Sequence, residues 1–288
     1  MISEDTDMLI VQPKKFEAKG QSGGHWYTAS GSPLHTQPDG KNTTLRHARK
    51  QDLYPSVTTL LGILDKPQLT KWKCDKCIEE AYYKRPLEDE DLQGYKNRIH
   101  HNLKGEQSEI LDFGTRVHNQ IEDYNNGIFN HENDPDVLPY VLKYIEWSKD
   151  RLVKVMAAEK VVVNHRYGYA GTVDLVGQTK YNKFPSVLID FKTQNVKGNK
   201  AKFYDTWALQ LAAYRKCFKP MPACMSLVIN SAKPEDQVEK IWTTEEMKDA
   251  WNVFKRALEI WQLQKKYKPT LGRLQALDPN NLEEAASE

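Results

Sequence analysis

The spacing of hydrophobic residues changes near the middle of the chain. Before residue 156, apolar positions recur three or four apart, which predicts amphipathic helices over 57–64, 67–83, 87–104, 108–126 and 135–152. After it, short runs rich in β-branched residues and bounded by turn residues predict a meander of strands at 157–163, 171–176 and 186–191. The pattern therefore predicts an α/β fold whose N-terminal half is helical.

Helix and strand patterns alternate again toward the C-terminus. A helix is expected over 203–217, with strands at 225–229 and 237–242. The last helix begins at a capping box formed by Thr243 and Glu246. Along the whole chain, we expect four regions. These are an irregular N-terminal segment over 1–52, a helical region over 53–152 that packs on the core, an α/β core over 153–270, and a disordered tail over 271–288.

Charge and hydropathy restrict the class of protein. The 288 residues include 41 Lys and Arg against 39 Asp and Glu, a net charge of +2, so only local clusters of charge could hold a nucleic acid or a membrane surface. No run of apolar residues is long enough to predict a membrane span, and the acidic N-terminus is not typical of a signal or transit peptide. With only four cysteines, we expect a soluble protein of a reducing cytoplasm.

The segment Leu188–Thr193 carries the clearest chemical signal. In a strand, Asp190 and Lys192 would share one face and lie about 6.6 Å apart. Such a carboxylate can hold a divalent cation, while the ammonium positions an attacking water or stabilises charge on a phosphate. The alternative is a surface ion pair on an edge strand.

A second acid stands in the preceding strand. Asp174 follows Gly171 and Thr172 and interrupts an otherwise apolar run. Burying a carboxylate without a partner is costly, and two carboxylates on neighbouring strands repel each other unless a cation lies between them. The alternative is that Asp174 caps a local backbone amide.

Two expected helices carry polar residues four positions apart. Gly114, His118 and Glu122 share one face of the helix over 108–126. The glycine would let another backbone approach closely, and a neutral imidazole can bind a metal ion. In the helix over 203–217, Gln210 and Tyr214 could bind phosphate oxygens or the lysine. The alternatives are a solvated face for the first helix, and a core tyrosine with an exposed glutamine for the second.

In this order, the segments resemble the PD-(D/E)xK nuclease superfamily, and within it the RecB-like exonuclease branch, which includes mitochondrial genome-maintenance exonucleases and phage proteins. The resemblance covers about residues 108–230. The chain departs from the superfamily's name, PD-(D/E)xK, in having Val173 in place of the proline before Asp174. It implies a restriction-endonuclease-like core, a mixed central β-sheet flanked by helices. It also implies a metal-dependent DNA exonuclease that acts on single strands or strand ends in replication, recombination or repair, in the cytoplasm of a bacterium or a phage-infected cell. The alternatives are a structure-specific or restriction-type endonuclease and a catalytically silent nucleic-acid-binding module.

The resemblance also implies a role for each site residue. Mg²⁺ or Mn²⁺ would be held by His118, Asp174, Asp190 and the main-chain carbonyl of Phe191. Lys192 would be the catalytic lysine, acting together with the two aspartates. Gln210 and Tyr214 would contact DNA phosphate or orient that lysine. Around the metal, Glu122 and Glu159 would form an outer shell.

Basic and aromatic residues near these motifs are candidates for binding DNA. The lysines expected to contact phosphates are Lys197, Lys200 and Lys202. A second basic stretch precedes the helix of His118 and contains Lys96, Arg98, His100, His101 and Lys104. The aromatic stretch His25–Tyr27 could cover the site. For any of these lysines the alternative is simple solvation.

The cysteines argue against a metal cluster. Members of this branch with an iron–sulfur cluster have one cysteine before the nuclease core and three after it, whereas this chain has Cys74 and Cys77 before it and Cys217 and Cys224 after it. We therefore expect ordinary buried thiols at Cys74 and Cys77.

Overall fold

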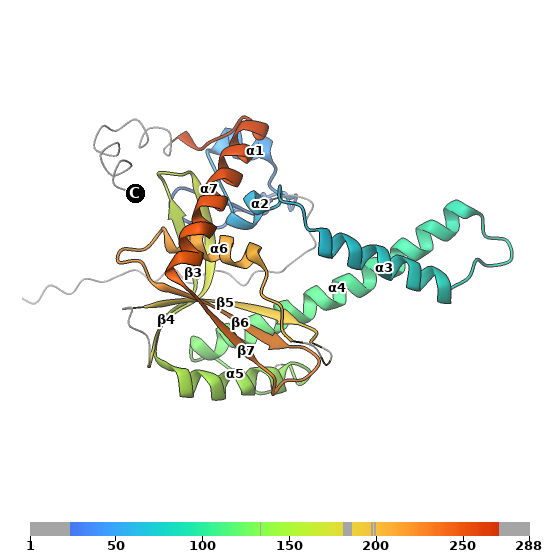
Figure 1. The fold of residues 1–288 in the computed structure, drawn as a ribbon. Coiled ribbons are helices and arrows are strands. Elements are labelled where there is room, and N and C mark those ends of the chain that lie inside the picture. The colour runs from blue at the N-terminus through green and yellow to red at the C-terminus, as the bar shows by residue number, and fades with distance from the viewer. Residues whose placement is uncertain (1–23, 133, 181–185, 197, 199, 271–288) are drawn as a thin grey trace, which may run out of the picture.

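A five-stranded mixed β-sheet forms the centre of the computed structural model, which describes residues 24–132, 134–180, 186–196, 198 and 200–270 (Figure 1). Its strands lie in chain order: β3 (Leu152–Asn164), β4 (Tyr169–Thr179), β5 (Val187–Gln194), β6 (Ala223–Asn230) and β7 (Val238–Trp242). Neighbouring strands are antiparallel except β5 and β6, which are parallel and joined through α6 (Asp205–Arg215). The predicted mixed α/β fold, a central sheet flanked by helices, is confirmed.

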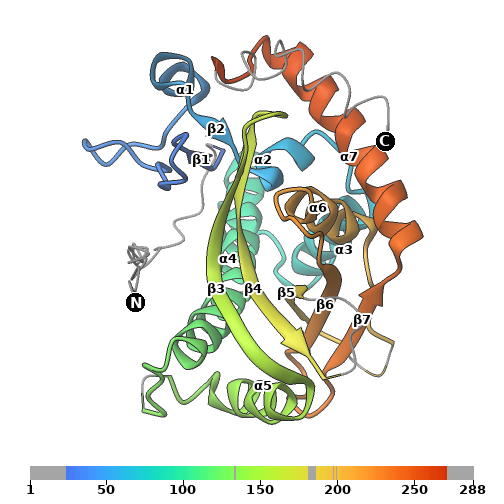
Figure 2. The ribbon, with the colours of Figure 1, turned by 90° about the vertical axis from the view of Figure 1, so that its left-hand side faces the viewer.

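Helices cover both faces of this sheet (Figure 2). One apolar core contains residues of α6 and α7 (Thr244–Lys265), and the other contains residues of α5 (Leu138–Arg151) and the inner half of α4 (Leu92–Asn125). Side chains alternate between the two along β5, where Leu188 packs in the first core and Ile189 and Phe191 in the second. The three inner strands β4, β5 and β6 are therefore largely buried on both sides, which explains their apolar runs.

The N-terminal segment packs against the beginning of β4, around Ala170. A two-residue strand, β1 (Trp26–Tyr27), pairs with β2 (Tyr54–Pro55), and the chain between them contains α1 (Leu45–Gln51). The short helix α2 (Val57–Leu61) follows directly and is capped by the Ser56 hydroxyl, which accepts from Thr59 N–H. Residues 24–61 thus bring aromatic side chains to β4.

A helical hairpin projects from the body of the molecule (Figure 1). It consists of α3 (Pro67–Tyr83), in which no residue is buried, and the outer half of α4; we call this hairpin the arm. The two helices expected over 87–104 and 108–126 are wrong as separate elements, because α4 is one helix of 34 residues, about 51 Å long. Glu106, Gln107 and Glu109 are good helix formers, and no proline breaks the chain between the two segments.

The position of the arm also corrects the expectation for the cysteines. Cys74 is exposed and Cys77 is half-buried, since both lie on α3, whereas Cys224 is buried in β6. All four cysteines are free thiols. Within the described residues, no helix is long and apolar enough to cross a membrane.

Candidate active site

Three carboxylates, those of Glu159, Asp174 and Asp190, meet where β4 and β5 separate. We call this place the opening. These strands pair only from Leu175 with Ile189 to Gly177 with Val187, and one further step in this register sets Asp174 opposite Asp190. On the other side of β4, the register with β3 sets Glu159 opposite Asp174. Like charges opposite one another destabilise a sheet. Glu159 also has a φ of 46°, a left-handed backbone that is costly for a residue other than glycine.

Main-chain and side-chain groups of β5 neutralise part of this charge. Asp174 Oδ2 accepts a hydrogen bond from the main-chain N–H of Phe191 at 2.7 Å, so the carboxylate does bind a backbone amide, although on the neighbouring strand rather than locally. Lys192 Nζ donates to Asp190 Oδ1 at 2.6 Å. Because β5 is the central strand and Asp190 is only 2% exposed, this is not a surface ion pair on an edge strand.

The α4 helix passes the same opening with the predicted face turned toward the sheet. His118 Nδ1 lies 3.8 Å from Asp174 Oδ2, and its ring packs edge-on against the ring of Phe191. One turn earlier, a Cβ at Gly114 would lie 2.8 Å from the hydroxyl oxygen of Thr193, so the close neighbour is a side chain and not a backbone. The interpretation of this helix face as solvated is therefore wrong.

Burial and mutual repulsion make the carboxylates reluctant to ionise. Burial, reinforced by the charges of Asp174, Glu122 and Asp190, raises the pKa of Glu159 to about 9. Burial also raises the pKa of Asp190 to about 6, against the opposing effect of Lys192. The pKa of Asp174 is raised for the same reason. The raised pKa of each carboxyl shows that the single charge of Lys192 is too little to balance all three carboxylates.

The two basic groups at the opening respond in opposite directions. Although burial disfavours the ammonium of Lys192, the charges of Asp190 and Asp174 outweigh it and raise its pKa, so the lysine remains charged at neutral pH. Burial, together with the charge of Lys192, lowers the pKa of His118 to about 4. Its imidazole is therefore neutral and has a lone pair to offer.

Helix α6 contributes the predicted amide and phenol. Gln210 Nε2 donates to the Tyr214 hydroxyl at 3.3 Å. Tyr214 is buried in the core, as the alternative interpretation expects, but Gln210 is half-buried and not exposed. The tyrosine ring lies so close to Gly171 that a Cβ there would be 2.6 Å from Tyr214 Cε1. This contact explains why residue 171 is a glycine.

A second tyrosine reaches the site from the N-terminal segment. The hydroxyls of Tyr27 and Thr172 share a hydrogen bond of 2.9 Å, and burial together with the charge of Glu159 contributes to a raised Tyr27 pKa. From the sequence, Tyr27 is expected only as part of an aromatic cover. The pattern of β1 is too short to place a residue that lies 145 positions away from its partner.

The lysines after β5 are only partly placed. Lys200 and Lys202 are exposed, and Gln194 holds the main chain of Lys202 through hydrogen bonds of 2.9 and 3.2 Å. Lys197 lies outside the described residues. Contact of these lysines with DNA stays a prediction.

The donors at the opening fit a hard divalent cation in type but do not form a ready-made shell. Carboxylates and an imidazole suit Mg²⁺ or Mn²⁺, and Asp190 Oδ2 is buried without a hydrogen-bond partner in the described chain. Yet no group of three or more His, Cys, Asp or Glu side chains among the described residues is arranged to hold a metal ion. In this structure Lys192 occupies the other oxygen of Asp190.

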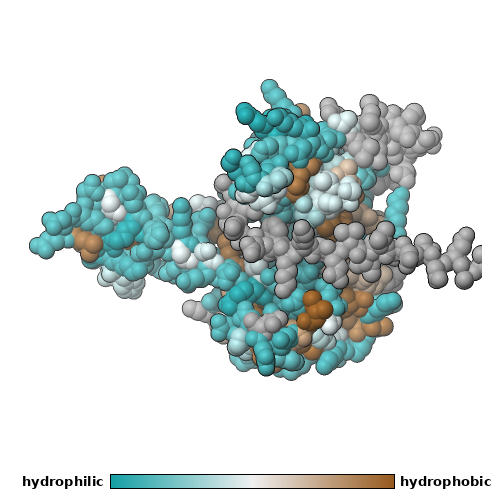
Figure 3. Space-filling model, turned by 180° about the vertical axis from the view of Figure 1, so that it is seen from behind, coloured by the Kyte–Doolittle hydropathy of each residue, from teal (hydrophilic) through white to brown (hydrophobic). Residues whose placement is uncertain are grey.

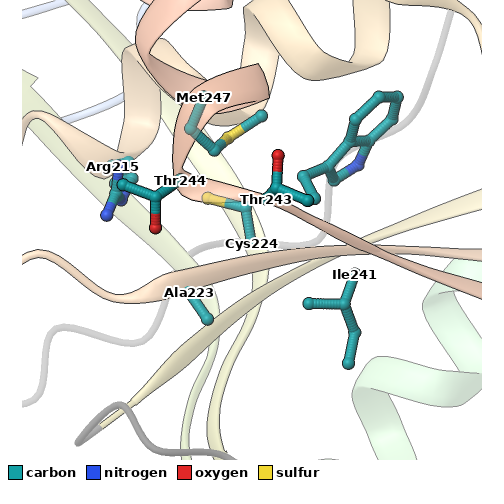
Figure 4. A pocket seen from close by; sticks show the side chains of 8 residues that line it. Arg215, Ala223, Cys224, Ile241, Thr243, Thr244 and Met247 are labelled. Atoms are coloured by element: carbon teal, nitrogen blue, oxygen red, sulfur yellow. The ribbon is translucent and has the colours of Figure 1, made fainter.

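A small pocket lies away from the opening (Figure 4). It has a volume of about 200 Å³ and lies between the start of β6, the end of β7 and the beginning of α7. Its lining consists of Arg215, Ala223, Cys224, Ile241, Trp242, Thr243, Thr244 and Met247. None of the predicted site residues lines it, so it does not bear on the chemistry at the opening.

Comparisons with known proteins do not identify a family. No family model matches the sequence. No curated protein matches it either. Among solved structures, the crystal structure of a "Putative exonuclease" from Eubacterium rectale is similar over 54% of this chain and 68% of that chain, with 12% identity and a TM-score of 0.38. A similarity this low assigns neither a fold nor a function.

Proposed function

We propose that the protein is a divalent-metal-dependent deoxyribonuclease that hydrolyses phosphodiester bonds from the ends of DNA strands. The observation that supports this most is the meeting of Asp174, Asp190 and Lys192 at the opening between β4 and β5. Surface ion pairs do not need a buried, unsatisfied carboxylate oxygen, whereas a cation-binding site does. The exonuclease form, the DNA substrate and a place in replication, recombination or repair rest on the family resemblance.

Each residue has a role in this proposal that its environment supports. Asp174, Asp190, His118 and the Phe191 carbonyl would hold Mg²⁺ or Mn²⁺, which would supply a Lewis acid and an activated water when bound. Because its pKa is raised, Lys192 acts as a cation that stabilises charge on the phosphate rather than as a base.

The surrounding residues would orient this centre and the substrate. Tyr214 and Gln210 form one hydrogen-bonded pair on α6, which can bind a phosphate oxygen or the lysine. Glu159 lies beside the aspartates, and because its pKa is raised to about 9 its carboxyl keeps a proton at neutral pH while no cation is bound. A divalent cation held by the aspartates would lower the pKa of Glu159 and favour its ionised form.

The test compares linear single-stranded DNA with a covalently closed single-stranded circle, in Mg²⁺, Mn²⁺ and EDTA. The proposal expects progressive shortening of the linear strand with either metal, no reaction in EDTA, and an intact circle. Rapid cutting of the circle would show that the same site acts as an endonuclease and not as an exonuclease. Binding of DNA without cleavage of any substrate would indicate a silent binding module.

A further inference from the structure

Helix α4 connects the arm to the candidate active site without a break. His118 lies in its inner half, beside Asp174, and the outer half packs against α3 (Figure 1). At 3.6 residues per turn, the residues that share the direction of His118 recur every three or four positions along the helix. Lys96, near the outer end of the helix, is 22 positions from His118, or about 33 Å along the axis.

A stripe of polar and basic side chains follows this direction outward from the site. Between residues 96 and 111, the side chains within about 40° of His118 are Lys96, His100, Lys104, Gln107 and Leu111; we call them the α4 stripe. All five are exposed except Gln107, which is half-buried. No acidic residue falls within the stripe, because Glu106, Glu109 and Asp112 point about 120° or more away from His118.

The cations of the α4 stripe have no acidic partner among the described residues, in contrast to four other cations of the arm. Lys71, Lys76 and Lys84 pair with acids on α3, and Arg98 pairs with Glu90. Within the described residues, no ion pair or hydrogen bond joins the side chains of Lys96, His100 or Lys104 to another group. Positive charge on the α4 stripe is therefore not neutralised by a neighbouring acid. Figure 3 shows that the arm's surface is largely hydrophilic on the face seen there.

We infer that the α4 stripe binds the phosphate backbone of the nucleic-acid strand whose end is at the active site. This inference rests on the proposed nuclease function and adds the path of the substrate outside the site. Lys96, His100 and Lys104 succeed one another at about 6 Å along the helix, so each can meet a different phosphate of an extended strand. An acidic protein partner would fit the same charge, but the stripe is continuous with His118, which favours the substrate.

The experiment measures binding of labelled single-stranded DNA in EDTA at several salt concentrations. The test variant is Lys96→Gln with Lys104→Gln. The control, Lys71→Gln with Lys76→Gln, makes the same change of charge on the arm but at lysines already paired with Asp75 and Glu79. For a long oligonucleotide, the slope of log affinity against log salt should fall by about 1.4 in the test variant, about 0.7 for each lost phosphate contact. The control should keep the wild-type slope.

A short oligonucleotide that fills only the site should bind both variants as it binds wild type. If the wild type binds and cleaves DNA but the test variant keeps the same salt slope, the α4 stripe does not bind the phosphate backbone. The nuclease proposal would still stand. Equal losses in test and control would also overturn this role of the α4 stripe. A wild-type protein that neither binds nor cleaves DNA would refute both proposals. Since the side chains of Lys96 and Lys104 are exposed and form no ion pair or hydrogen bond within the described part of the chain, melting temperatures should not change. Lys96→Arg with Lys104→Arg should bind as wild type.

Discussion

Replacing Glu159 by glutamine tests whether the site is short of positive charge. Glu159 faces Asp174 across β3 and β4, and burial raises its pKa to about 9 from 4.5. A carboxyl whose pKa is raised by folding stabilises the protein fully below pH 4.5, and this contribution is lost as the pH rises toward 9. Glutamine has nearly the same shape and does not titrate, so Glu159→Gln should remove the loss.

The size of the effect follows from the pKa values. Between pH 4.5 and pH 7, the unfolded chain releases this proton and the folded chain keeps it, over 2.5 pH units. At about 1.4 kcal/mol per unit, the wild type loses about 3 kcal/mol of folding stability over that range. This is an upper limit, because Glu159 is half-buried and retains some water.

The assay is urea unfolding of both proteins in EDTA at a series of pH values. The difference in free energy of unfolding should be near zero at pH 4 and should grow in favour of the variant up to pH 7. Comparing the two proteins at each pH removes the titration of groups that they share. Parallel pH profiles would refute the assignment of Glu159 to a repulsive carboxylate cluster.

Two further substitutions probe the neighbours of that cluster. His118→Ala should raise the concentration of Mn²⁺ needed for half-maximal cleavage, since it removes a nitrogen donor, whereas Glu122→Ala should raise it less; equal metal titrations for wild type and His118→Ala would exclude the histidine as a ligand. Gly171→Ala should destabilise the protein by about 1–3 kcal/mol, because the new Cβ would lie 2.6 Å from the Tyr214 ring. An unchanged melting temperature would contradict this packing.

The short-range pattern of the sequence was sufficient for most of the helices and strands. The alternation around Leu188, Asp190 and Lys192 placed the acid and the lysine on one face, and the apolar run at 225–229 lies in β6, which pairs with β5. Turn and capping signals also located α7, whose capping box at Thr243 and Glu246 is present. These features depend on residues that are close in the chain.

Features that depend on distant residues did not follow from the sequence. The fusion of two expected helices into α4 is an exception, because Glu106, Gln107 and Glu109 favour a helix and no proline separates the two segments, so the sequence itself allows one continuous helix. The contact between Tyr27 and Thr172, and the place of Glu159 opposite Asp174, come from the register and packing of separate segments. The exposure of Cys74 likewise follows from the projection of α3 away from the body.

The most direct test of the proposed chemistry is single-turnover cleavage of end-labelled single-stranded DNA by wild type and by Lys192→Ala, with DNA binding measured on the same samples. Lys192 is the cation that pairs with Asp190, and its loss should slow cleavage in Mg²⁺ or Mn²⁺ by about 100-fold or more while DNA binding stays within a few-fold. Cleavage by Lys192→Ala at the wild-type rate would contradict the assignment of the active site.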